Sequence, residues 1–261
     1  MQKWTVPLEA SELPIRSVSL LDPPDPSDWL GQLPVVVHLA RQGPLVFRNP
    51  VTFLVGENGT GKSTLLEAVA VAYGFNAEGG GRNFAFSTCA THSGLHDRIR
   101  LGKGVRRPTD GFFLRAESFY NVASRIDELD REPAAAPPII RSYGGRSLHA
   151  QSHGESFLSL VIHRFGGNGL YLLDEPEAAL SPSRLFTLLV RLDELVRSGS
   201  QFIIATHSPV LMAYPGAEIL VLDRKGIHPT PYEETDHVRL TRRFLNHPES
   251  MLRELLGPNE P

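Results

Sequence analysis

A glycine-rich turn between an apolar run and a helical pattern constrains the fold more than any other feature of this sequence. Residues 51–55 read Val-Thr-Phe-Leu-Val, which is typical of a buried parallel strand, and the residues after Gly61 have the apolar periodicity of a helix. Between them stands a glycine, four further residues, and then Gly61, Lys62 and Ser63. Backbone N–H groups of such a turn can surround phosphate groups, and the positive end of the helix points at the same place.

The turn therefore predicts a phosphate-binding loop. We expect Lys62 to pair with the β- and γ-phosphates of a nucleotide and the Ser63 hydroxyl to coordinate Mg²⁺. An ordinary glycine-rich turn would not need this strand before it and this helix after it. The expected binding residues are Gly56, Asn58, Gly59, Thr60, Gly61, Lys62, Ser63 and Thr64.

A second apolar run ends in two neighbouring carboxylates, Asp174 and Glu175. Residues 170–173 read Leu-Tyr-Leu-Leu, and neighbouring side chains of a strand point to opposite faces, so the two acids can take different roles. We expect Asp174 to hold Mg²⁺ and Glu175 to orient or deprotonate the attacking water. A solvated strand end has the same pattern, and the phosphate-binding loop earlier in the chain favours the functional interpretation.

His207 follows a third apolar run, residues 201–205. It stands 32 residues after Glu175 (207 − 175 = 32), a separation that accommodates one helix and one strand. In a parallel sheet this spacing returns His207 to the edge at which Glu175 lies, where ligands collect. A lone histidine at a strand end is more often structural, but this placement predicts donation to the γ-phosphate.

The segment Ser-His-Gly-Glu-Ser (152–156) precedes an apolar helical pattern and has two interpretations. In the first, Ser152 and Glu155 form a capping box that satisfies free N–H groups of the first helical turn. In the second, the Ser152 hydroxyl, the Gly154 N–H and the positive helix end bind phosphate. Both can hold for one segment, and the residues alone favour the capping box.

Composition excludes several classes of protein. The single cysteine, Cys89, excludes an internal disulfide and is typical of a reducing compartment. No stretch approaches the ~20 apolar residues of a membrane span, and the first residues lack the apolar core of a signal peptide. We therefore expect a cytoplasmic protein that does not enter the membrane.

The charge of the chain gives no global preference for nucleic acid or an anionic membrane, because 26 basic and 29 acidic residues leave a formal net charge of −3. One local segment is basic. It spans residues 98–107 and could contact the phosphate backbone of a nucleic acid, or it could form a solvated hairpin. Its charged residues are Arg98, Arg100, Lys103, Arg106 and Arg107.

Strands that alternate with helices predict an α/β fold with a mostly parallel central sheet. We expect an edge strand over residues 15–21 and an antiparallel hairpin formed by residues 34–40 and 44–49 around a short glycine turn. A long helix is expected over residues 181–199, and the C-terminal segment 236–256 also has a helical pattern.

These motifs together resemble the ATPase domain of the ABC family. The glycine-rich loop, the 152–156 segment, the Asp174–Glu175 strand end and the His207 turn occur in that family's order as its Walker A, signature, Walker B and switch-histidine motifs. The resemblance covers roughly residues 34–223. The whole chain is similar to the small stand-alone bacterial predicted ATPases labelled "AAA family ATPase", which lie nearer the SMC and DNA-repair heads than the transporters.

The resemblance implies a P-loop NTPase fold of ABC type, with an antiparallel β-subdomain and a short helical lobe. It implies one domain over 1–261, composed of a P-loop lobe (34–116), a helical lobe (117–151), a part with the later motifs (152–223) and a C-terminal hairpin and helix (224–261). It also implies a head-to-tail homodimer with ATP and Mg²⁺ in the interface. Each loop is then completed by Ser152 and Gly154 of a second copy.

The chain departs from the transporter pattern at three places. The signature reads Ser-His-Gly-Glu-Ser, and no aromatic residue is suited to stack on adenine, since Phe47 stands too close to the loop. Where transporters carry a magnesium-binding glutamine, this chain offers Glu117 as a metal ligand.

The segment 118–151, where a helical lobe is expected, holds 34 residues (151 − 118 + 1 = 34), too few for a long coiled coil.

The function expected from this resemblance is ATP hydrolysis by a dimerising ATPase with Glu175 and His207 as catalytic residues. It would act as a switch on a nucleic acid or protein partner. Two alternatives are the nucleotide-binding subunit of an ABC transporter and a nucleotide-binding module without hydrolysis. The departures at the signature and at Glu117 argue against the first, and the presence of Glu175 and His207 argues against the second.

Overall fold

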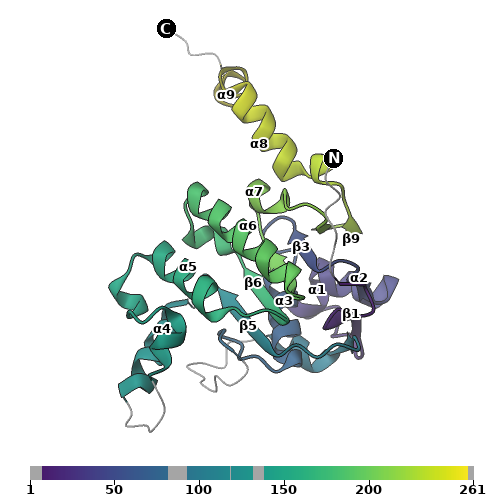
Figure 1. Cartoon of the computed structure of the whole chain (residues 1–261). Helices are drawn as coiled ribbons and strands as arrows, with labels where there is room; N and C mark the ends of the chain where they lie inside the picture. Colours follow the sequence, from purple (N-terminus) through teal and green to yellow (C-terminus); the bar gives the residue numbers. More distant parts are fainter. Residues whose placement is uncertain (1–7, 82–92, 118, 132–137, 258–261) are drawn as a thin grey trace.

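The computed structural model describes residues 8–81, 93–117, 119–131 and 138–257, and Cys89 lies outside them. Its centre is a six-stranded sheet in the order β5-β6-β7-β3-β8-β9 (Figure 1). All neighbouring strands run parallel except the last pair, which is antiparallel, so the predicted mostly parallel α/β sheet is confirmed. The strands are β3 (Val51–Val55), β5 (Asp110–Arg115), β6 (Gly169–Asp174), β7 (Gln201–Ala205), β8 (Glu218–Asp223) and β9 (Gly226–Pro229).

The register of the parallel strands brings several strand ends to one edge of the sheet. Arg115 lies opposite Asp174, and Asp174 lies opposite Ala205. Leu54, one residue before the end of β3, lies opposite Ala205 from the other side. The segments that follow β3, β6 and β7 therefore begin next to one another, as the carboxyl ends of parallel strands require.

Three strands from the first half of the chain form a smaller antiparallel sheet. It has the order β2-β1-β4, with β1 (Ile15–Leu20), β2 (Leu45–Val46) and β4 (Ile99–Lys103). The strand predicted over residues 15–21 is present, but it lies between two partners and is not an edge strand. The basic segment 98–107 thus includes β4, which is preceded by the 3₁₀ helix η1 (Gly94–Arg98).

The hairpin predicted over residues 34–49 is wrong, because its first half is helical. α2 (Pro34–Gln42) follows the short α1 (Trp29–Gln32), and β2 after it pairs with β1. Three valines and the short glycine turn favoured a hairpin, but Pro34 suits the first turn of a helix. Val35, Val36 and Leu39 then lie on one buried side of α2, and this packing overrides the weak local preference of β-branched residues.

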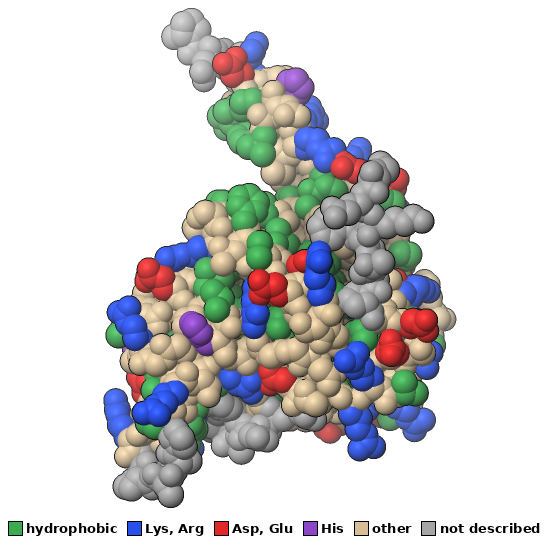
Figure 2. Space-filling view, viewed as in Figure 1, with side chains coloured by type: hydrophobic (Ala, Val, Ile, Leu, Met, Phe, Trp, Pro, Cys, Tyr) green, Lys and Arg blue, Asp and Glu red, His purple; other side chains and the backbone are tan. Residues whose placement is uncertain are grey.

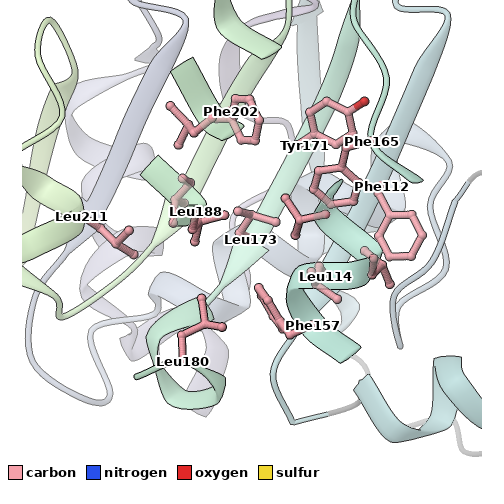
Figure 3. Close-up of a cluster of buried hydrophobic side chains, with 14 of the residues drawn as sticks. Phe112, Leu114, Phe157, Phe165, Tyr171, Leu173, Leu180, Leu188, Phe202 and Leu211 are labelled. Carbon is pink, nitrogen blue, oxygen red and sulfur yellow. The ribbon is translucent and has the colours of Figure 1, made fainter. Parts of the chain in front are cut away.

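Helices cover both faces of the central sheet and bury two apolar clusters. On one face α4 (Phe119–Arg131), α5 (His153–Arg164) and α6 (Pro182–Arg197) pack against the sheet, where Phe165 stacks on Tyr171 at 4.2 Å between ring centroids (Figure 3). On the other face lie α3 (Lys62–Tyr73), α2 and the antiparallel sheet. Two 3₁₀ helices, η2 (Ile139–Tyr143) and η3 (Leu148–Ala150), stand between α4 and α5.

The C-terminal residues form two helices that extend away from the sheet (Figure 1). After α7 (Pro209–Met212), β9 and the 3₁₀ helix η5 (Tyr232–Glu234), the chain forms α8 (Asp236–Asn246) and α9 (Pro248–Leu256). The helical pattern predicted over residues 236–256 is confirmed and breaks before Pro248, since a proline disfavours helical backbone at the residue before it. We call α8 and α9 together the C-terminal arm.

Candidate active site

The loop between β3 and α3 has a backbone that glycine alone suits. Gly59 and Gly61 have φ values of +82° and +95°, in the left-handed region. A Cβ atom at Gly61 would also lie 2.4 Å from Cγ1 of Val35, which belongs to α2. The loop is thus held closely against α2, and its residues 56–61 end where α3 begins at Lys62.

Lys62 is buried inside this loop with 4% of its surface exposed. Its Nζ donates to the carbonyl oxygens of Gly56, at 2.7 Å, and Glu57, at 3.1 Å. Burial lowers the pKa of Lys62, while the carboxylates of Glu175 and Asp174 oppose that shift. A cation is therefore fixed beside the loop backbone.

Ser63 and Asp174 meet at the base of the same site. The Ser63 hydroxyl donates to Oδ1 of Asp174 at 2.9 Å. Burial raises the pKa of Asp174 to about 6, against the opposing effects of the Ser63 hydrogen bond and the Arg115 guanidinium. A hydroxyl and a carboxylate so placed are hard oxygen donors of the kind that Mg²⁺ takes, and the pair fits that ion.

A cavity of about 220 Å³ opens in front of this pair. Glu117, two residues beyond β5, contributes to its wall, and the Glu117 side chain is 87% exposed. The cavity thus brings together the three residues predicted as metal ligands, although they come from distant parts of the sequence. Its lining residues are Ser63, Arg115, Ala116, Glu117, His153, Asp174, Glu175 and Ala178.

Arg115 is a residue of this cavity that the sequence patterns did not single out. Its Nη1 donates to Oε2 of Glu67 at 2.8 Å, and its Nε lies 3.6 Å from Oδ2 of Asp174. The guanidinium also lies 3.8 Å from Glu117. Arg115 therefore links the carboxylate at the end of β6 to the helix that follows the loop. An arginine at the end of an apolar strand carries no motif, so only the register against Asp174 reveals it.

Glu175 and His207 lie side by side at the carboxyl edge. His207 Nε2 is 3.6 Å from Oε1 of Glu175. Glu175 has φ +49° and ψ 52°, a left-handed conformation that is uncommon for a residue with a side chain. Its N–H donates to the carbonyl of Ala205 at 2.9 Å, which fixes it beside the end of β7. His207 therefore lies at the same edge of the sheet as Glu175, as its spacing of 32 residues predicts, and the two side chains are in contact.

Glu177, in the 3₁₀ helix η4 (Pro176–Ala179), holds the turn that carries His207. Its Oε1 accepts the Thr206 hydroxyl at 2.8 Å and the His207 N–H at 2.5 Å. The Ser208 N–H in turn donates to the Thr206 hydroxyl oxygen at 3.0 Å. Glu177 is a second residue that the sequence patterns missed, because nothing in the spacing of Glu175 and His207 indicates what orients the turn between them.

Ser152 and Gly154 stand at the start of α5 and contact their own chain. The Glu155 carboxylate accepts the Ser152 N–H at 3.0 Å, as the helix-capping interpretation predicts, and it also accepts the Ser152 hydroxyl at 2.7 Å. A Cβ atom at Gly154 would lie 2.5 Å from Nη1 of Arg184, so glycine allows α6 to approach. Neither residue lines the cavity beside Ser63, whereas His153 between them does.

Two family models match separate parts of the chain. The model described as "AAA domain, putative AbiEii toxin, Type IV TA system" matches residues 145–213, and the model described as "AAA domain" matches residues 38–112. The second range contains the loop with Lys62, and the first contains Asp174, Glu175 and His207. The two matches therefore cover the loop, the end of β6 and the segment after β7, whereas Arg115 and Glu117 lie between the matched ranges.

The chain is also similar to a transport ATP-binding protein, and solved structures of an ABC transporter and an SMC head domain align with it. A protein described as probable branched-chain amino acid transport ATP-binding protein LivF, from Archaeoglobus fulgidus, is 27% identical in an alignment of 207 residues that covers 75% of this chain and 86% of that protein. The structure of "an inward-facing conformation of a putative metal-chelate type ABC transporter" aligns at 17% identity with a TM-score of 0.48, covering 88% of each chain. The SMC head domain from Thermotoga maritima aligns at 17% identity with a TM-score of 0.37, covering 72% of this chain and 92% of that one.

Proposed function

We propose that this chain, an ABC-type P-loop ATPase, hydrolyses ATP to ADP and phosphate at the carboxyl edge of its central sheet. The observation that carries the proposal is a convergence of groups from the ends of three parallel strands. Lys62 and Ser63 follow β3, Asp174 ends β6 and Glu175 comes directly after it, and His207 follows β7 with its Nε2 at 3.6 Å from Glu175. This set contains a phosphate-binding cation, two metal ligands, a base and a hydrogen-bond donor.

Each group has a defined task in the reaction. Lys62 and the loop N–H groups bind the β- and γ-phosphates, and Ser63, Asp174 and Glu117 hold Mg²⁺, which when bound neutralises charge on the phosphate oxygens. Glu175 accepts a proton from the attacking water. The water oxygen bonds to the γ-phosphorus while the bond from that phosphorus to the oxygen of ADP breaks. His207 donates to the γ-phosphate.

The proposal includes an ATP-dependent homodimer in which the start of α5 faces the nucleotide of a second copy. The Ser152 hydroxyl, the Gly154 N–H and the positive helix end form an anion-binding group. Arg184 supports this assignment, because its guanidinium lies 3.4 Å from the Ser152 hydroxyl oxygen and 3.3 Å from the Glu155 carboxylate. The positive charge of Arg184 thus offsets the negative charge of Glu155, which would otherwise repel a phosphate. The hydroxyl that now donates to Glu155 would donate to the γ-phosphate.

Ser152→Arg tests the two-copy site. In a chain that also carries Glu175→Gln, ATP with Mg²⁺ should produce a dimer by light scattering, and adding Ser152→Arg should return the protein to the monomer. The arginine places bulk where the γ-phosphate of the second copy must dock, and the site on its own chain keeps Lys62 and Ser63.

Ser198→Arg is the matched control for this experiment. Ser198 is exposed, and its backbone carbonyl oxygen accepts the Asn168 N–H at 2.8 Å. This contact lies beside the amino end of β6, whereas Asp174 lies at the carboxyl end of that strand. The control variant should still dimerise on ATP. If the Ser152→Arg variant dimerises equally well, the segment 152–156 is a helix cap alone and the two-copy site is wrong.

The proposed role of the ATPase is a switch that acts on a nucleic acid or protein partner. The basic segment 98–107 favours a nucleic acid as this partner, but its side chains differ in what they contact. Arg98 pairs with Asp22 at 2.8 Å, and Arg106 donates to Asn168 at 2.6 Å. Arg100 and Arg107 are exposed and are the charges to test.

Replacement of Arg100 and Arg107 by glutamate tests this partner. If the segment neutralises phosphates, the affinity for DNA or RNA should fall steeply with salt, and the double change should reduce the slope of log affinity against log salt by about 2. Fluorescence anisotropy with ATP-Mg²⁺ present measures both quantities. Absence of binding by the unaltered protein at low salt would leave a protein partner as the proposal.

A transporter subunit is a second candidate, because the relative named LivF is a transport ATP-binding protein. None of the described helices is long and apolar enough to cross a membrane. As a transporter subunit, the chain would work with a membrane protein. Co-purification of one membrane protein from a detergent extract, in a fixed ratio to this chain, would favour the transporter over the switch.

A further inference from the structure

The His207 ring has a second neighbour that comes from the C-terminal arm. Nδ1 of His207 lies 3.1 Å from Nε2 of His237, in the first turn of α8, and the two ring centroids are 5.3 Å apart. The other ring nitrogen of His207, Nε2, is the atom that lies 3.6 Å from the Glu175 carboxylate. His207 is thus held between a histidine of the arm and the proposed base.

We infer that His237 is a positioning residue for hydrolysis, which fixes the tautomer and orientation of His207 from the C-terminal arm. This inference rests on the proposed function, because it assigns His237 a part in the reaction at Glu175. His237 acts through His207, and no contact of its own with the nucleotide is required.

The contacts of His207 decide which tautomer is favoured. A neutral imidazole has one N–H donor and one acceptor nitrogen. If His207 carried its proton on Nδ1, the lone pair of Nε2 would face the negative Glu175 carboxylate. If the proton is on Nε2, this N–H points to the carboxylate, and Nδ1 accepts a hydrogen bond from Nε2–H of His237. The second arrangement gives each nitrogen of His207 a complementary neighbour, and its Nε2–H is the donor that would turn from Glu175 to the γ-phosphate.

The environment of His237 supports its part as a neutral donor. Burial, together with the neighbouring His207, lowers the pKa of His237, while Glu57 opposes this shift. This shift favours the neutral ring, which carries a single N–H. The side of the His207 ring that bears Nδ1 thus meets a group that can give one hydrogen bond without adding charge.

Buried residues on both sides of His237 hold the first turn of α8 in place. Thr235 is buried with 1% exposed and donates its hydroxyl to the Tyr232 carbonyl at 2.9 Å, directly before the helix. Val238, with 3% exposed, belongs to the apolar cluster under α6. His237 stands between these two anchors, so its ring is directed by residues on both sides.

The rest of the arm has few contacts with the body of the molecule. Leu240, Phe244 and Leu245 of α8 are exposed, as are Leu252, Leu255 and Leu256 of α9, and Figure 2 shows hydrophobic side chains gathered on the arm. Val238 is the one buried residue within α8, and α9 has none among its described residues. A displacement of α8 that removed the partner of His207 would therefore expose one buried side chain of that helix, Val238.

His237→Ala and His237→Gln test the inference together. Alanine removes the donor, whereas the side-chain amide of glutamine places an N–H near the position of the histidine Nε2. His237→Ala should lower kcat for ATP about 10-fold to 100-fold, by analogy with the loss of a partner that orients a metal-bound histidine, with little change in KM. His237→Gln should recover most of that loss. His247→Ala, an exposed histidine after α8, is the control and should match the unaltered protein.

The tautomer of His207 gives a readout that a merely structural role would not move. ¹⁵N NMR of the imidazole nitrogens should show His207 protonated on Nε2 in the unaltered protein and a mixture of tautomers in His237→Ala. An unchanged kcat and an unchanged tautomer in His237→Ala overturn the inference, provided that Glu175→Gln has lost activity. If Glu175→Gln turns over normally, the assignment of Glu175 as the base fails instead, and with it the premise on which the inference about His237 rests.

Discussion

Glu175→Gln is expected to slow ATP turnover by about 10²–10⁴-fold, the contribution of a well-placed general base. Glutamine keeps the size of the side chain and its ability to hydrogen-bond, but it cannot take the proton of the attacking water. The left-handed backbone at Glu175 and the hydrogen bond from its N–H to Ala205 should persist, because neither depends on the carboxylate. Phosphate release under saturating ATP-Mg²⁺ measures the loss.

Nucleotide binding should survive this change, since Lys62 and Ser63 are untouched. Glu194→Gln is the matched control, because Glu194 is an exposed carboxylate of α6 that pairs with Arg191 at 2.8 Å and lies outside the site. The control should keep the normal rate. A Glu175→Gln variant within twofold of that rate would falsify the assignment of Glu175 as the base, and the carboxylates nearest to it, Asp174 and Glu177, would become the next candidates.

The parts of the site that could be predicted are those fixed by backbone geometry. The loop around Lys62 is defined by glycines that a left-handed turn requires, and the helix after it follows from periodicity. Asp174 and His207 could be placed at one edge because parallel strands share their carboxyl edge, and the register of β6 against β7 places them there. These inferences need only the spacing and type of residues along the chain.

The residues that could not be predicted act through contacts between distant segments. Arg115 reaches Asp174 across neighbouring strands, Glu177 holds the turn before His207, and His237 approaches His207 from the C-terminal arm. None of the three has a pattern of its own, because an arginine, a glutamate or a histidine on a surface is common. The position of each becomes informative only when the register and the helix packing are known.

The error at α2 has a related cause. Val35, Val36 and Val37 favour a strand by intrinsic preference, but that preference is weaker than the burial of one helical side against neighbouring elements. Val35 is also the residue against which Gly61 packs. The segment that was mistaken for a hairpin is therefore part of what holds the phosphate-binding loop in place.

Lys62→Ala is expected to weaken ATP binding at least about 100-fold, because it removes the cation at the phosphates and the charged hydrogen bonds of Nζ, each worth about 1.5–3 kcal/mol. Lys62 already lies buried in the loop, where its Nζ donates to Gly56 and Glu57 at 2.7 Å and 3.1 Å, so nearby water cannot take its place at low cost.

Calorimetric titration of ATP-Mg²⁺ measures this loss. Lys103→Ala serves as the control, since Lys103 is exposed on β4 and lies over the Tyr73 ring at 4.8 Å. The control should bind normally, and comparable thermal unfolding of the two variants would show that the loop change has not unfolded the sheet. An affinity of Lys62→Ala equal to that of the control would mean that the residues 56–64 do not bind the nucleotide, and the proposals for Ser152, Glu175 and His237 would then lose their common premise.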